Sequence, residues 1–177
     1  MIEISADQLR TVLPFAGRFA DTYAAPLTQA CAEFEISTAA RVAAFVAQIG
    51  HESGQLHYVR ELATGAAYEG RRDLGNTEPG DGPRFRGRGL IQCTGRTNYR
   101  QAGAALGLDC EVSPELLEEP INACRVSAWW WHQHGLNELA DRGEFQRITF
   151  RINGGTNGLA DRLALWSRAK TVFGVAT

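Results

Sequence analysis

A stretch rich in glycine and proline interrupts an otherwise helical pattern, and it limits the folds open to this chain more than any other feature. Between Gly65 and Gly95 the apolar residues follow no helical period, and glycine or proline recurs throughout. An irregular segment of this length inside a compact domain is usually functional. We therefore expect a mainly α-helical domain with one small β or irregular segment, placed at a cleft between two lobes.

Apolar residues on both sides of this segment recur at the spacing of amphipathic helices. The clearest case is Val42, Phe45, Val46 and Ile49, in a helix that we expect Ser37 to cap. The other helices are expected to begin at Ser5 (with Gln8 in a capping box), Pro26, Thr97 (ending at Gly107), Ser113, Ile121, Glu144 and either Gly158 or Leu159.

Length and charge narrow the class of protein. With 177 residues, of which 44% are apolar, the chain is expected to form one domain over residues 1–177. The net charge of −2 argues against a general nucleic-acid binder. Seven arginines and four acidic residues lie between Tyr68 and Arg100, so this region is either a basic patch for an anionic polymer or an ion-paired loop.

No feature of the sequence indicates a membrane protein or a metalloprotein. No apolar run is long enough to span a bilayer, and residues 1–5 lack a signal peptide's basic and apolar regions, so we expect a cytoplasmic protein without stable membrane insertion. The four cysteines form no CxxC pair and are expected to be buried free thiols. His51-Glu52 does not begin an HExxH zinc motif, because residue 55 is glutamine. We therefore expect neither metal nor cofactor.

Glu52 is the most informative single residue. Continuing the helix at 100° per residue places Glu52 beside Phe45 and Ile49, at the edge of the buried face, and Ser53-Gly54 then ends the helix. A carboxyl packed against apolar side chains favours its protonated form, as the general acid of a glycosidase requires. Such an enzyme needs a second carboxylate. The pattern alone does not choose among the candidates Glu61, Glu69, Glu78 and Asp81.

Four stretches of the sequence together resemble the family 19 chitinases, in particular their compact phage-type endolysin branch. They are FVAQIGHESGQLHYVREL from residue 45, YEGRRDLGNTEPGDGPRFRGRGLIQCTGRTNY from 68, NACRVSAWWWHQHGLNELAD from 122 and FQRITFRINGGTNGLADR from 145. The resemblance implies a lysozyme-like, two-lobed helical fold and a metal-free inverting glycosidase.

The same resemblance assigns roles to individual residues. Glu52 matches the general acid, Glu61 the base, and Thr94 a residue that helps to hold the attacking water. Residues that match substrate-binding positions are Gln92, Asn98, Tyr99, Asn153 and Arg162, the last two also organising the carboxylates. Two features depart from the family pattern. The stretch from Glu61 to Tyr68 is short, which keeps Glu69 as an alternative base, and Asn157 stands where plant-type chitinases have an acid.

The expected substrate follows from these features. Peptidoglycan is favoured by the phage-type motifs, by the lack of a signal peptide and by the basic loop. Chitin is the alternative, and a non-catalytic glycan-binding protein on a hydrolase scaffold is a second one. We expect a monomer that remains in the cytoplasm until a membrane-pore partner of the holin type releases it to the cell wall.

Overall fold

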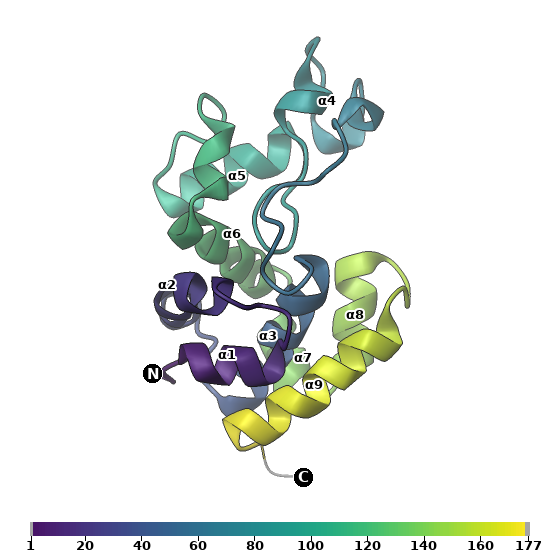
Figure 1. Ribbon diagram of the computed structural model, residues 1–177. Coiled ribbons are helices and arrows are strands. Elements are labelled where there is room, and N and C mark those ends of the chain that lie inside the picture. Colours follow the sequence, from purple (N-terminus) through teal and green to yellow (C-terminus); the bar gives the residue numbers. More distant parts are fainter. Residues whose placement is uncertain (1, 176–177) are drawn as a thin grey trace.

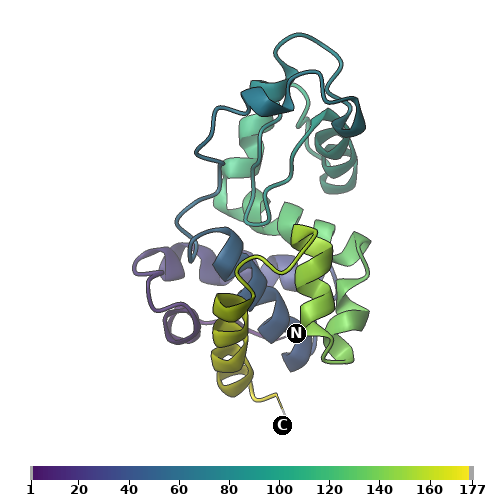
Figure 2. The ribbon, with the colours of Figure 1, turned by 90° about the vertical axis from the view of Figure 1, so that its right-hand side faces the viewer.

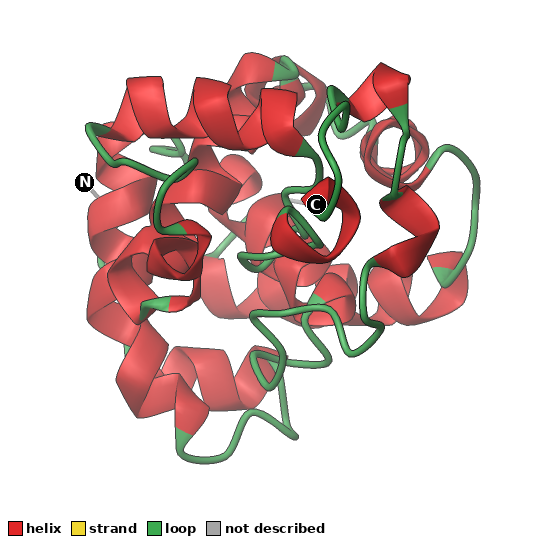
Figure 3. Ribbon diagram, turned by 90° about the horizontal axis from the view of Figure 1, so that it is seen from above, coloured by secondary structure: helices red, strands yellow, loops and turns green. Residues whose placement is uncertain are grey.

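The computed structural model describes residues 2–175, which form helices joined by loops (Figures 1 and 3). Within this range the only β-pairing consists of isolated bridges, from Arg60 to Arg88 and from Arg88 to Cys93. The α-helices are α1 (Ala6–Val12), α2 (Phe19–Glu33), α3 (Ala39–Glu52), α4 (Asp81–Arg84), α5 (Arg96–Leu106), α6 (Pro120–Gln133), α7 (Leu136–Asp141), α8 (Phe145–Asn153) and α9 (Leu159–Phe173). Three short 3₁₀ turns are η1 (Ala66–Tyr68), η2 (Arg72–Leu74) and η3 (Pro114–Glu118).

The chain folds into two lobes, as expected (Figures 1 and 2). The lower lobe contains α1, α2, α3, α7, α8 and α9, and the upper lobe contains α4, α5 and the loops around them. Each lobe has its own cluster of buried apolar residues. Helix α6 contributes to both, because Trp131 packs in the lower cluster and Trp129 in the upper one.

Helix α3 forms the centre of the lower lobe. Every residue from 42 to 50 is buried, and the helix packs against α7 and α9. Its N-cap is Thr38, whose hydroxyl accepts the N–H of Arg41 at 3.2 Å, so the expected cap at Ser37 is wrong by one residue. The helix ends at Glu52, as predicted, because the chain turns back through Gly54 to Leu56, all with positive φ.

Other expected helix boundaries are confirmed or corrected. The capping box of Ser5 and Gln8 begins α1, and Gly107 ends α5 in the left-handed conformation. Pro26 does not start a helix: it lies inside α2, where its missing N–H removes one intrahelical bond but leaves the face that packs on α6 intact. The segment from Pro114 forms only a 3₁₀ turn instead of the expected helix. The sequence pattern did not predict α7.

The irregular segment between α3 and α5 is anchored by short backbone pairings. Glu61 N donates to the Gly87 carbonyl at 2.9 Å, and Gly89 N donates to the Val59 carbonyl at 2.9 Å. Gly89 has φ of +80°, and a Cβ there would lie 2.5 Å from a methyl group of Val126. The close packing therefore requires glycine at position 89 and brings Glu61 against the segment 87–93.

The four cysteines are free and buried, and burial raises the pKa of the Cys93 thiol to about 12. These thiols are therefore packing groups rather than nucleophiles at neutral pH. Within residues 2–175, none of the helices combines the length and the apolar character that a bilayer crossing requires.

Candidate active site

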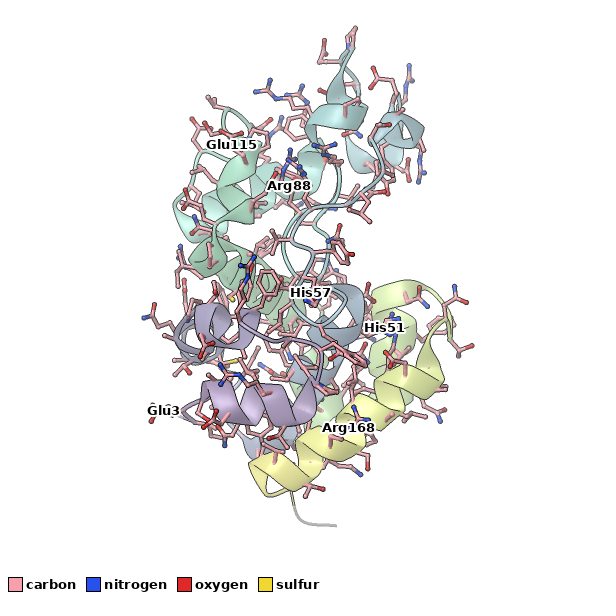
Figure 4. All side chains as sticks on the ribbon, in the orientation of Figure 1. Glu3, His51, His57, Arg88, Glu115 and Arg168 are labelled. Carbon is pink, nitrogen blue, oxygen red and sulfur yellow. The ribbon has the colours of Figure 1, made fainter. Side chains whose placement is uncertain are left out.

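A pocket of about 320 Å³ lies where the end of α3 meets the base of the upper lobe. It is lined by Glu52, Tyr58, Arg60, Glu61, Leu62 and Gln92. In Figure 4, His51 marks the end of α3 in the lower lobe and Arg88 lies in the upper lobe. The two glutamates predicted from the sequence thus face one shared pocket, one from the last residue of α3 and the other from the segment that follows.

Glu52 is bound by an arginine from the far end of the chain. Arg162 Nη2 donates to Oε1 of Glu52 at 2.5 Å, and the side chain of Glu52 is 20% exposed. Among the described residues none donates a hydrogen bond to the other oxygen, Oε2. The expected apolar surroundings are therefore incomplete, because a buried cation lies against one oxygen of Glu52.

The same arginine connects three segments. Its Nη1 donates to Oε1 of Gln48 at 2.5 Å and its Nε donates to the Asn157 carbonyl at 3.2 Å, while its side chain is only 2% exposed. Gln48 in turn donates to the Thr149 hydroxyl at 2.8 Å. Arg162 thus holds one oxygen of the Glu52 carboxylate, and it has almost no surface with which to contact a sugar.

Glu61 is held by groups of the upper lobe. The Tyr68 hydroxyl donates to Oε1 at 3.0 Å, and the backbone N–H of Gly87 donates to Oε2 at 3.2 Å. A Cβ at position 87 would lie 3.3 Å from Oε2 of Glu61 and 2.5 Å from Oε1 of Gln92. Glycine therefore lets the backbone approach the carboxylate closely.

Of the predicted site residues between positions 92 and 98, one lines this pocket. Gln92, with φ of +63°, lines the pocket and donates to the Gly89 carbonyl at 3.2 Å. Thr94 and Asn98 are partly exposed and are not among the lining residues. The Thr94 hydroxyl donates to the Gln92 carbonyl at 3.0 Å, and Asn98 Nδ2 donates to the Thr94 carbonyl at 2.7 Å.

Tyr99 does not line the pocket, which corrects the expected sugar contact. Its side chain is 0% exposed, and its hydroxyl donates to the Arg86 carbonyl at 2.6 Å and accepts from Arg88 at 2.9 Å. Tyr99 therefore supports the segment 86–88 from behind. Asn153 is the last residue of α8, and its Nδ2 is buried without a hydrogen-bond partner among the described residues.

The other candidate carboxylates stabilise the upper lobe. The two oxygens of Glu69 accept the N–H groups of Gly80 at 2.7 Å and Gly82 at 2.8 Å. Asp81 is buried and accepts two hydrogen bonds from Arg96, which lower the pKa of its carboxyl. Glu78 is exposed. None of the three is among the residues that line the pocket.

The arginine-rich region is largely neutralised by ion pairing. Four of its seven arginines form ion pairs: Arg71 with Asp73, Arg88 with Glu118, Arg96 with Asp81, and Arg100 with Glu111. Of the two interpretations of this segment, the ion-paired loop accounts for most of its charge. Within residues 2–175, no group of three or more His, Cys, Asp or Glu side chains is placed to hold a metal ion.

Sequence reasoning missed three contributors to the site. Tyr68 and the N–H of Gly87 contact Glu61 through tertiary packing, and no local pattern indicates such contacts. Gln48 did carry a signal: it is a polar residue within the run of buried positions from 42 to 50. A polar side chain in such a run needs a buried partner, which Arg162 and Thr149 provide.

Comparison with known proteins gives a consistent result. A family model described as "Chitinase class I" matches residues 19–140, more than half of the chain. A glycosyl hydrolase family 19 domain-containing protein of Haemophilus influenzae is 37% identical over 107 residues, which cover 60% of this chain and 51% of that protein. An Arabidopsis thaliana endochitinase is 36% identical over 115 residues, covering 64% of this chain and 39% of the relative. The chain thus matches about half or less of the length of these relatives.

Solved structures share the fold over nearly the whole chain. Chitinase C from Streptomyces griseus has a TM-score of 0.79 at 25% identity, covering 98% of this chain and 78% of that one. A bacterial family 19 chitinase has a TM-score of 0.81 at 24% identity, covering 99% and 97%. These similarities confirm the expected mainly helical, lysozyme-like fold.

Proposed function

Because this chain belongs to glycoside hydrolase family 19, the class I chitinase family, we propose that it is an endo-acting glycosidase that cleaves β-1,4 bonds of bacterial peptidoglycan. One observation carries the proposal: Glu52 and Glu61 line the same pocket and are held by different donors. Hydrolysis of a glycosidic bond needs two such carboxyl groups, one to protonate the leaving oxygen and one to activate water.

In the proposed mechanism Glu52 is the general acid. Arg162 occupies Oε1, so the proton is carried on Oε2, which has no donor among the described residues and can face the glycosidic oxygen. The proton on Oε2 passes to the glycosidic oxygen as the bond to the anomeric carbon breaks.

Glu61 is the proposed base. Its ionised form suits the two hydrogen bonds that it accepts, from Tyr68 and from the N–H of Gly87. Each oxygen of the carboxylate keeps a lone pair with which to accept a proton from water. Thr94 is proposed to help hold that water through the free lone pairs of its hydroxyl. Attack from the face opposite the leaving group inverts the anomeric carbon.

The choice of substrate rests on two kinds of support. The motifs from residue 45 to residue 162 resemble the compact endolysin branch, which favours peptidoglycan. Chitin is the second candidate, since similar relatives include endochitinases of Arabidopsis thaliana and an acidic endochitinase of Beta vulgaris, the latter 30% identical over 144 residues. The ion pairing of the arginine-rich region weakens the argument from charge.

A paired assay tests the proposal. Wild-type protein and the Glu52→Gln variant are added to outer-membrane-permeabilised bacteria, with loss of turbidity as the readout, and to N-acetylglucosamine hexamers, with release of reducing sugar as the readout. Lysis by the wild-type protein but not by the Glu52→Gln variant supports a peptidoglycan hydrolase. Sugar release without lysis supports a chitinase. Saturable binding to either polymer without hydrolysis supports the non-catalytic glycan-binding protein.

We further propose that the chain acts as a monomer and reaches the wall from the cytoplasm through a membrane pore formed by another protein. Light scattering of the purified chain tests the first statement. Expression in bacteria with and without a pore-forming membrane protein tests the second, with culture lysis expected only when both proteins are present.

A further inference from the structure

Tyr68 closes the loop that begins at Glu61. Its hydroxyl donates to Oε1 of Glu61, while the N–H of Gly87 donates to Oε2. The residues between the two, such as the 80%-exposed Leu62, lie mostly at the surface. The phenol is therefore the side-chain contact that ties the carboxylate of Glu61 across this loop.

The position of Tyr68 is set by the upper lobe. Its carbonyl accepts a hydrogen bond at 2.9 Å from Nδ2 of Asn76, which is 0% exposed. The turn η1 that contains Tyr68 is preceded by its N-cap Gly65, whose φ is +82° and where a Cβ would lie 2.6 Å from the Gly82 carbonyl oxygen. These buried contacts hold the backbone of Tyr68 in the position from which its hydroxyl reaches Glu61.

The phenol keeps its proton over the working range of a hydrolase. Burial and the hydrogen bond to Glu61 raise the pKa of Tyr68, and only the charge of Arg71 acts in the opposite direction. Tyr68 is therefore a permanent donor at neutral pH. The other charged residues that line the pocket beside Glu61 are Glu52 and Arg60.

Building on the function proposed above, we propose that Tyr68 is a positioning residue for the base. A hydrogen bond donated to a carboxylate stabilises its ionised form, which is the form that removes a proton from water. Two donors on two different oxygens also fix the plane of the carboxylate, and with it the direction in which the bound water lies. The phenol acts through Glu61 and touches no reacting atom.

A positioning role for Tyr68 and a role in sugar binding predict different kinetic effects when the phenol is lost. A phenol that only contacts the glycan contributes to binding of substrate, so its loss raises KM and leaves kcat and the pH profile unchanged. A phenol that positions the base contributes to the chemical step. Its loss lowers kcat, and it moves the acidic limb of the pH–rate profile to higher pH because the ionised form of the base has lost a donor.

The test compares Tyr68→Phe with Tyr23→Phe on whichever of the two polymers the wild-type protein hydrolyses faster. Tyr23 lies in α2, in the lower core, so its change controls for the loss of a phenol elsewhere. For Tyr68→Phe we expect kcat to fall about tenfold, the scale of one hydrogen bond to a charged group. KM should stay within about twofold of the wild-type value, because the phenol touches no sugar, and the acidic limb should move to higher pH. Tyr23→Phe should retain the wild-type profile.

Further variants separate failure of this inference from failure of the function. If Glu61→Gln keeps full activity, the base is another residue and the role of Tyr68 falls with it. If Glu61→Gln is inactive while Tyr68→Phe matches the wild type in kcat and pH profile, the function stands and the inference is overturned. A rise in KM alone overturns it as well, and melting curves of each variant show whether the fold is preserved.

Discussion

Arg162 and Glu52 are 110 residues apart in the sequence, yet Nη2 of the arginine lies 2.5 Å from Oε1 of the glutamate. The contact joins the first turn of α9 to the last residue of α3, the two helices that pack most closely in the lower lobe. Because Arg162 is 2% exposed, water cannot replace Glu52 as its partner. The orientation of the proposed acid therefore depends on the packing of α9.

The first prediction concerns the acid itself. Glu52→Gln keeps an oxygen that can accept from Arg162 but cannot donate a proton as an acid. We expect kcat to fall by about 10²- to 10⁴-fold, the usual contribution of general acid–base catalysis. Binding to the polymer should change little, whereas the melting temperature should fall, because the buried guanidinium of Arg162 loses its charged partner. The measurement is the rate of reducing-sugar release beside a sedimentation binding assay, and a turnover near that of the wild type would contradict the assignment.

The second prediction concerns the link between α9 and α3. Lysine at position 162 keeps the charge, but one ammonium group cannot reach Glu52, Gln48 and the Asn157 carbonyl together. We expect Arg162→Lys to reduce the free energy of unfolding by about 1–3 kcal/mol, the cost of unmade buried hydrogen bonds. Urea denaturation measures it, and kcat should fall in the same variant.

Arg168→Lys is the matched control for that change. Arg168 is exposed on the same helix and is labelled on α9 in Figure 4. It should behave as the wild type in both stability and turnover, because exposed charges contribute little to folding. If both lysine variants lost the same stability and turnover, the effect would come from a change of arginine to lysine anywhere on α9 and not from the contact with Glu52.

The third prediction separates the two candidate bases. Glu61→Gln should abolish turnover, since the variant cannot accept a proton from water. Glu69→Gln should stay within about threefold of the wild-type kcat and lose about 1 kcal/mol of stability, because Glu69 only accepts backbone N–H groups of the upper lobe. Progress curves on one substrate decide the matter. Inactivity of the Glu69 variant with activity of the Glu61 variant reverses the assignment.

Local pattern was sufficient to predict α3 and the place of Glu52. The helix follows from apolar spacing, and its end follows from Ser53 and Gly54, both of which act over a few residues. The same logic failed at Pro26, because proline is favoured in a first turn but is tolerated inside a helix whose packing face is intact. The short helix α7 was missed because its six residues carry less than two full turns of pattern.

The contacts that orient the two carboxylates could not be predicted in this way. Arg162 reaches Glu52 because α9 packs on α3, and Tyr68 reaches Glu61 because a loop closes through buried contacts of the upper lobe. Exposure also depends on packing: Tyr99 and Gln92 are close in sequence, yet one is buried behind the pocket wall and the other lines the pocket. The motif assigned both to the cleft, and only the fold distinguishes them.

The fourth prediction concerns the pH dependence of the upper lobe. Asp81 accepts two hydrogen bonds from Arg96 and one each from the N–H groups of Thr77 and Glu78, which together hold the pKa of its carboxyl below its usual range against the effect of burial. When the pKa of a carboxyl is lower in the folded state than in the unfolded state, the group stabilises the fold at any pH above its unfolded-state pKa. This contribution is lost as the pH falls through the folded-state pKa. Asp81→Asn should therefore reduce the free energy of unfolding by about 2 kcal/mol at pH 7, the scale of hydrogen bonds to a charged group. The difference in this free energy between variant and wild type should narrow below about pH 4. Thermal unfolding at pH 7, 5 and 3 measures this gap. A gap of constant size across the three pH values would mean that the charge of Asp81 contributes nothing to its effect on stability.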